Sequence, residues 1–234
     1  MQLQQTKQPA PAPQAAKPKP AGPPPEFQEG DIATMDAAPL IRILTDAGSS
    51  EFRKAKACQR IGELGAIEAV PALAALLDDE RLSTYARYGL EPIADPSADE
   101  VLRAALTRLN GNLRIGVINS ISKRGDAEAG PALAKLIYDS DAAAARAALE
   151  ALGSIGGVSS MNELQTALLK TGGMTRMAAA DAALLCAERF LAEGNRDQAM
   201  ALYASLSAVG MPKPARLAAM ASIIREETAI NRPR

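Results

Sequence analysis

Residues 61–79 read IGELGAIEAVPALAALLDD, and this stretch decides the fold. Apolar residues on both sides of Gly65 recur at the three- and four-residue spacing of a buried helix face. Gly65 predicts a helix end, because a left-handed backbone is least unfavourable for glycine. Pro71 predicts the first turn of a second helix, where few amide hydrogen bonds are lost. The stretch therefore predicts two helices joined by a tight turn.

The same arrangement returns further along the chain. The sequence SISKRGDAEAGPALAKLIYDSD (120–141) aligns without a gap with RIGELGAIEAVPALAALLDDER (60–81), so that Gly125 and Pro131 stand at the turn and at the helix start. Weaker copies lie at 84–111 and around a glycine turn further on, at ALGSIGGVSSMNELQTALL. Self-similarity with a period of about 30 residues is typical of a solenoid.

Composition agrees with stacked helices. Aromatic residues make up 3% of the chain and Trp is absent, while Ala and Leu, both strong helix formers, are abundant. We therefore expect an all-α, right-handed α-solenoid of stacked helix pairs over residues 31–234. The clearest repeats span 51–170, and 175–208 diverges.

The N-terminal segment has a different composition. Eight of the sixteen prolines precede residue 26, and residues 1–25 carry three lysines and no acidic residue. Residues 1–30 are therefore expected to be a disordered Pro/Ala/Lys-rich linker of extended, polyproline-like character. A ligand for an SH3-type domain is the alternative.

The repeats resemble a known family. Ala148, Leu152 and Gly153 resemble the A-x-x-x-L-G turn of HEAT repeats, and the helix at 69–77 with its trailing Asp79 resembles their A-V-P-x-L-x-x-L-L helix. The order of units is also similar to HEAT-repeat proteins of planctomycetes and verrucomicrobia, which implies a large, exported multidomain protein. The spacing within 175–208 partly resembles a tetratricopeptide unit, through Ala187, Phe190, Gly194, Ala199, Tyr203 and Leu206.

Several kinds of function are disfavoured. The chain has no His, which removes the commonest general base and metal ligand, and its two cysteines stand among apolar helix residues. We expect no cofactor and no catalytic site. No transmembrane run or signal peptide is evident, which makes the cytoplasm the default compartment, with export if the native N-terminus lies upstream. The last helix lacks a pairing helix, so the chain is expected to be a piece of a longer one.

Candidate binding residues are basic or polar. If second helices line the concave face, Arg103 and Arg108 stack there and meet a phosphate or an acidic peptide. Asn119 either bonds backbone groups between repeats or faces a ligand. The candidate partner-binding residues are Arg87, Arg103, Arg108, Asn119, Lys123 and Arg124.

The favoured function is a non-enzymatic scaffold or adaptor that binds a protein or peptide on the concave face. Two alternatives remain open: a HEAT-like enzyme similar to bilin lyases, and a nucleic-acid-binding HEAT-like protein. The chain carries a net charge of −1, and the three lysines of residues 1–25 leave −4 for the rest. An acidic body disfavours nucleic acid.

Overall fold

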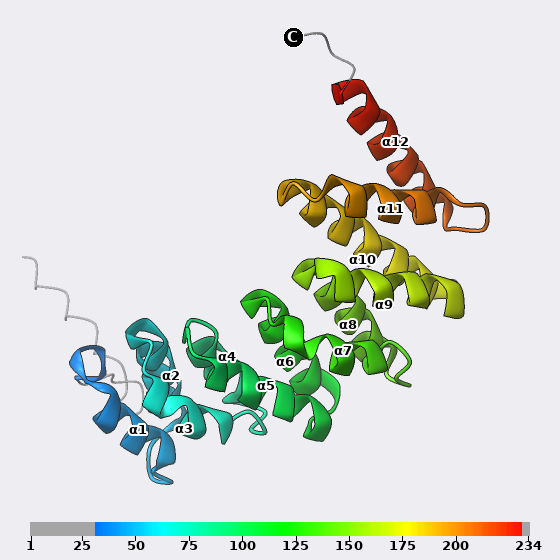
Figure 1. Cartoon of the computed structure of the whole chain (residues 1–234). Helices are drawn as coiled ribbons and strands as arrows, with labels where there is room; N and C mark the ends of the chain where they lie inside the picture. Colours follow the sequence, from blue (N-terminus) through cyan, green and yellow to red (C-terminus); the bar gives the residue numbers. More distant parts are fainter. Residues whose placement is uncertain (1–30, 231–234) are drawn as a thin grey trace, which may run out of the picture.

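The computed structural model describes residues 31–230, and the linker expected at 1–30 lies outside them. The described residues are almost entirely helical and contain no strand (Figure 1). The helices are α1 (Ala37–Thr45), α2 (Glu51–Leu64), α3 (Val70–Ala74), α4 (Ser83–Leu90), α5 (Pro96–Arg108), α6 (Gly111–Arg124), α7 (Gly130–Leu136), α8 (Ala142–Ile155), α9 (Gly157–Lys170), α10 (Gly173–Ala192), α11 (Arg196–Ser207) and α12 (Lys213–Ile230).

The turn that decides the fold is present as predicted. Helix α2 ends at Leu64, and Gly65 takes the left-handed conformation with φ of 62°. A short 3-10 turn (Ile67–Ala69) leads into α3, whose second residue is Pro71. The copy after α6 repeats this geometry, with Gly125 at φ 71°. The two predicted helices and their glycine turn are therefore confirmed.

The buried face of α2 does not follow a constant spacing of three residues along the helix. A face built on every third residue would include Phe52 and Leu64, but Phe52 is half-buried and Leu64 is exposed. Each step of three residues falls about 60° short of a full turn, so a long series of such steps leaves the core face. The buried residues are Ala57, Cys58, Ile61 and Gly62.

Gly153, which the resemblance to HEAT repeats places at a turn, has a different role. It lies inside α8 rather than at its end, and Gly156 (φ 71°) is the residue that ends the helix. A Cβ atom on Gly153 would stand 2.5 Å from the carbonyl oxygen of Ala182 in α10. The glycine therefore allows the backbones of α8 and α10 to approach closely.

The helices form two rows in a curved stack (Figure 1). Helices α2, α4, α6, α8 and α10, the first row, follow the inner side of the bend, and α3, α5, α7, α9 and α11, the second row, follow the outer side. Neighbouring helices of the first row also contact each other more extensively than those of the second row. The expectation that second helices line the concave face is therefore wrong.

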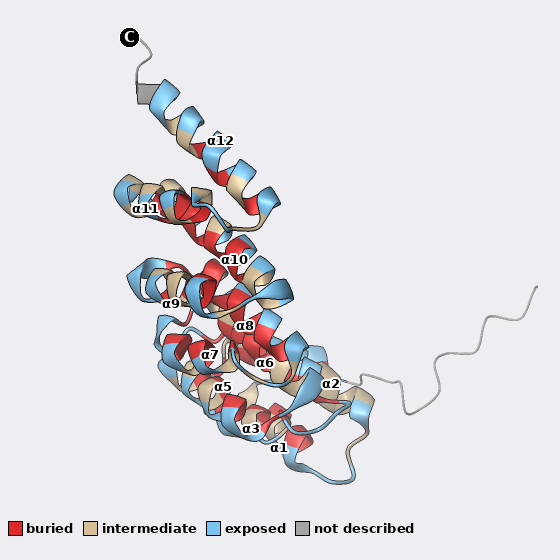
Figure 2. Ribbon diagram, turned by 90° about the vertical axis from the view of Figure 1, so that its right-hand side faces the viewer, coloured by how far each residue is buried: buried red, intermediate tan, exposed pale blue. Residues whose placement is uncertain are grey.

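The apolar core lies between the two rows along the whole stack, as the buried residues in Figure 2 show. Its members are small and aliphatic, with Phe190 and Tyr203 as the aromatic residues fully or nearly buried. Small residues keep successive helices close, which explains how a chain so poor in aromatic residues forms a continuous core. The architecture is an α-solenoid.

Candidate functional site

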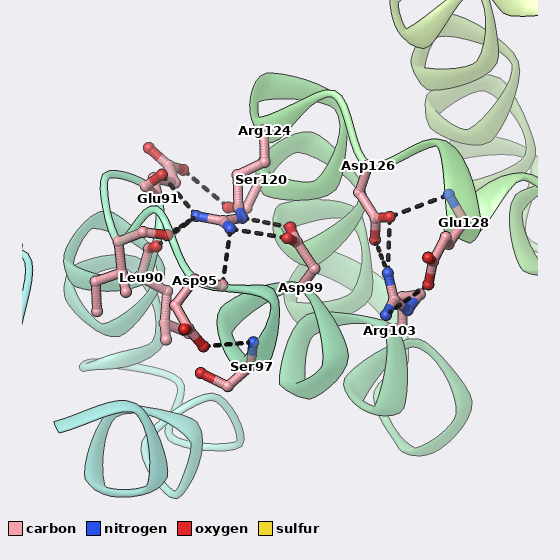
Figure 3. Close-up of polar contacts among 11 residues, drawn as sticks. Leu90, Glu91, Asp95, Ser97, Asp99, Arg103, Ser120, Arg124, Asp126 and Glu128 are labelled. Atoms are coloured by element: carbon pink, nitrogen blue, oxygen red, sulfur yellow. Dashed lines mark hydrogen bonds and ion pairs between the residues drawn. The ribbon is translucent and has the colours of Figure 1, made fainter. Parts of the chain in front are cut away.

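The arginine at the end of α6 binds the preceding repeat (Figure 3). Arg124 donates to the carbonyl oxygens of Leu90, Glu91 and Ile93 at 3.0, 2.9 and 2.7 Å. Its guanidinium also forms a two-pronged ion pair with Asp99, at 2.5 and 2.9 Å. The hydrogen bond with Asp99 raises the pKa of Arg124, although burial alone would lower it. Arg124 therefore joins repeats.

Arg103 makes a second bridge of this kind. From α5 it contacts both carboxylate oxygens of the buried Asp126 at 2.7 and 2.8 Å, and Glu128 at 3.1 Å. Burial alone would lower the pKa of Arg103, but the hydrogen bond and charge of Asp126 outweigh it and raise the pKa. Asp126 also accepts from the backbone N–H of Glu128 at 3.1 Å, so it caps the turn that follows α6.

Arg108 lies further along α5 and pairs with Asp78 of the preceding repeat. Both Arg103 and Arg108 belong to the outer row, so they do not form the concave ladder expected from the sequence. Arg114 of α6 pairs at 2.8 Å with Asp139, which follows α7, so this pair joins the two helices of one repeat. Arg103, Arg108 and Arg124, in contrast, hold successive repeats in register.

Arg87 belongs to α4, and its side chain reaches α6. Its guanidinium occupies the space where a Cβ of Gly116 would lie, and it donates to the carbonyl oxygen of Gly116 at 3.1 Å and to the Ser120 hydroxyl at 3.3 Å. Burial lowers the pKa of Arg87, which the charge of Glu91 opposes. The Ser120 hydroxyl donates in turn to Glu91 at 2.8 Å.

Lys123 and Asn119 are the two candidates that stay exposed on the first row. Lys123 pairs with Glu91 at 2.6 Å, which raises its pKa, and its Nζ lies 5.7 Å from the centre of the Tyr88 ring. Asn119 is exposed and has no hydrogen-bond partner within residues 31–228, so the expectation of a buried inter-repeat amide is wrong. The adjacent Ser120 is the buried polar residue of α6.

Two hollows open on the first row. The first, which we call the Tyr88 pocket, has a volume of about 360 Å³ and lies between α2, α4 and α6. The second, which we call the Met groove, has a volume of about 520 Å³ and lies between the N-terminal halves of α8 and α10. The Tyr88 pocket is lined by Gln59, Gly62, Glu63, Tyr88, Glu91, Pro92 and Lys123. The Met groove is lined by Ala142, Ala143, Ala145, Arg146, Leu149, Met174, Thr175, Met177, Ala178 and Asp181.

Sequence reasoning did not find either hollow. Met174 and Met177 are exposed, although methionines in a helical repeat usually fill the core. Tyr85 and Tyr88 are also exposed, in a chain with few aromatic residues. The sequence did contain one signal, the pair Tyr85 and Tyr88, which stand one helical turn apart. This pair could be assigned to an exposed surface only after the structure had shown that α4 belongs to the first row.

The remaining reactive groups are buried or dispersed. Cys58 and Cys186 are free and fully buried, and burial raises their pKa values to about 12 and about 11. Among the residues that the structure describes, no cluster of three or more His, Cys, Asp or Glu side chains could hold a metal ion. In the same part of the chain, no helix is both long and apolar enough to span a bilayer.

The comparison with protein families agrees with this architecture. Residues 98–183, from the start of α5 into α10, match the family model of HEAT repeats. This part of the chain carries HEAT repeats. HEAT repeats generally act as protein-interaction scaffolds, and the family is typically non-enzymatic. No curated protein matches the chain.

Proposed function

We propose that this HEAT-repeat chain is a scaffold whose first row binds an extended segment of a protein partner, with apolar side chains of that segment in the Met groove. The observation that carries the proposal is the exposure of Met174 and Met177 beside Leu149 and a series of alanines. Flexible thioether side chains adapt to different apolar groups, which suits a peptide-binding surface.

The charges at the edge of the groove support a peptide rather than a nucleic acid. Arg146 and Asp181 both line it, so it offers one group of each sign to a peptide backbone or side chain. Four of the candidate arginines are engaged in bonds between repeats, and the chain has a net charge of −1. Neither bilin chemistry nor nucleic-acid binding is favoured by a feature of the described residues.

The earlier candidates divide accordingly. Asn119 and Lys123 are kept in the proposed interface because they are exposed on α6, a helix of the first row, and Lys123 lines the Tyr88 pocket. Arg87, Arg103, Arg108 and Arg124 are assigned to the frame that holds this surface in shape. A partner would therefore meet few unpaired cations on the inner side of the bend.

A peptide selection tests this proposal. The full chain serves as bait for a phage-displayed library of random peptides, and the affinity of enriched peptides is measured by fluorescence anisotropy. We expect Met177→Asp to weaken binding at least about tenfold, since a carboxylate would be buried against apolar side chains. Leu169→Asp, at an exposed position of α9 in the outer row, is the matched control and should leave the affinity unchanged.

Two results would contradict the proposal. One is that no peptide is enriched above the phage background. The other is that enriched peptides bind the two aspartate variants equally well, which would place the binding surface outside the Met groove.

A further inference from the structure

The Tyr88 pocket combines an open aromatic ring with carboxylates. The side chain of Tyr88 is 59% exposed, and Gly62 and Pro92 form an apolar wall beside it. Glu63 and Glu91 supply two carboxylates to the lining, and Lys123 supplies one ammonium group. Glu91 is already paired with Lys123 at 2.6 Å, and Glu63 pairs with Arg60 at 3.1 Å but has a side chain that is 50% exposed. The surface therefore suits a ligand that offers flat apolar rings and brings a cation to Glu63.

The start of the described chain lies at the rim of this pocket. Ile32 and Ala33 share a small cavity with Gln59 and Glu63, and the latter two residues also line the Tyr88 pocket. The described chain therefore begins next to the Tyr88 pocket, separated from it only by the side chains of Gln59 and Glu63.

The residues that precede it have the matching chemistry. Residues 17–25 read KPKPAGPPP, with five prolines, two lysines and no acidic residue. A proline-rich segment favours the polyproline II conformation, which rises about 3.1 Å per residue and needs little further ordering on binding. Six residue steps separate Pro25 from Asp31, and an extended chain of that length spans about 20 Å, so the loop that closes is short.

We propose that residues 17–25 occupy the Tyr88 pocket of their own chain, with proline rings on Tyr88 and a lysine facing Glu63. Proline rings pack on tyrosine faces in aromatic-lined grooves, and a lysine ammonium is attracted by nearby carboxylates. The chain body has a net charge of −4 against +3 on residues 1–25, which favours the same association.

This docking gives the first row an internal occupant. The docking proposal and the proposed function share only the first row, because the Met groove between α8 and α10 is a separate hollow from the Tyr88 pocket. A partner that extends from the Met groove toward α2 would have to displace residues 17–25. The segment would thereby act as a competitor that selects for tighter ligands.

Paramagnetic relaxation in the full chain tests the proposal. A nitroxide is attached to Ala21→Cys, and it labels this position selectively because Cys58 and Cys186 are fully buried. We expect the label to increase the relaxation rates of the Gly62, Tyr88 and Lys123 amide protons. The increase should be at least twofold above that in a variant with Pro18, Pro20, Pro23, Pro24 and Pro25 replaced by serine.

A matched pair of tyrosine variants locates the contact. Tyr88→Ala should reduce the enhancement at Gly62 at least twofold, whereas Tyr138→Ala, equally exposed but just beyond α7 in the outer row, should not. Equal spectra for the serine variant and the parent would overturn the proposal, as would an enhancement that Tyr88→Ala leaves intact.

A mixture of spin-labelled unenriched chain with unlabelled ¹⁵N-enriched chain separates docking within one chain from docking between two. Enhancement in that mixture as strong as in the single chain would overturn docking in cis and show exchange between copies. These spectra contain no added peptide, so failure of the peptide selection and failure of the docking are observed independently.

Discussion

The guanidinium of Arg124 and the carboxylate of Asp99 meet in a two-pronged ion pair that joins α6 to α5 (Figure 3). The Arg124 side chain is 8% exposed and also binds carbonyl oxygens at the end of α4. One side chain therefore closes the contact between two repeats.

Replacement of this arginine should destabilise the stack. Arg124→Met keeps the length of the side chain but leaves a carboxylate and several carbonyl oxygens without their donor. We expect a loss of about 3 kcal/mol in the free energy of unfolding, measured by urea titration with far-ultraviolet circular dichroism. Arg146→Met is the control, because its 3.5 Å pair with Glu150 is exposed and should contribute less than about 0.5 kcal/mol. Equal effects of the two variants would refute the structural role of Arg124.

Two glycines that look alike in the sequence should respond in opposite ways to alanine. Gly153→Ala would place Cβ against the Ala182 backbone, and we expect a loss of about 1–3 kcal/mol. Gly130 is helical, and the nearest atom to its Cβ would be the Ser159 hydroxyl at 3.7 Å. Gly130→Ala should therefore stabilise by up to about 1 kcal/mol through helix propensity. Thermal melting of the two variants checks the signs, and the same sign for both would contradict the close packing of α8 on α10.

Asp126 should be sensitive to the loss of its charge alone. Asp126→Asn removes a charge-assisted bond from Arg103 and weakens the cap on the Glu128 N–H. We expect a loss of about 2 kcal/mol in the free energy of unfolding. Glu128→Gln tests the other acid bound to Arg103, whose side chain is 80% exposed, and it should change the stability by less than about 0.5 kcal/mol. A larger effect at Glu128 would show that the exposed pair carries the contact.

The two thiols should report unfolding and should make stability depend on pH. Their folded pKa values of about 12 and about 11 lie above the ordinary value of 9.0. The protonated form is therefore favoured in the folded state, and this contribution is complete below pH 9 and is lost as pH rises through the folded values. A disulfide reagent at neutral pH should modify Cys58 and Cys186 only after urea is added.

A double variant without the two thiols is the control for the predicted pH dependence. In a Cys58→Ala/Cys186→Ala variant, the free energy of unfolding should fall less steeply above pH 9 than in the parent. Rapid modification of either thiol in the folded chain would contradict the burial on which both expectations rest.

Local sequence signals predicted the elements of the fold well. The end of α2, the left-handed Gly65 and the early Pro71 of α3 each depend on residues within one turn of themselves. A backbone conformation that glycine favours, or an amide that proline lacks, can be read without knowledge of distant contacts. The gapless copy at Gly125 then extended one turn to a repeating architecture.

The candidate site could not be predicted in the same way. Arg124 binds Asp99 and the end of α4, and these partners depend on how far one repeat is offset from the next. No spacing inside one helix contains that offset. Asn119 and Ser120 show a related limit, because a step of one residue turns a helix by about 100° and separates an exposed amide from a buried hydroxyl. The inner row likewise follows from the curvature of the whole stack.

The bridges between repeats have a mechanical consequence. Arg108 to Asp78 and Arg124 to Asp99 each tie neighbouring units along the stack. A pull applied between the first and last helices would pass through the junctions in series, so each junction, with its ion pairs and its apolar packing together, would carry the full load. The array would then yield at its weakest junction and extend stepwise, as a spring of linked segments does.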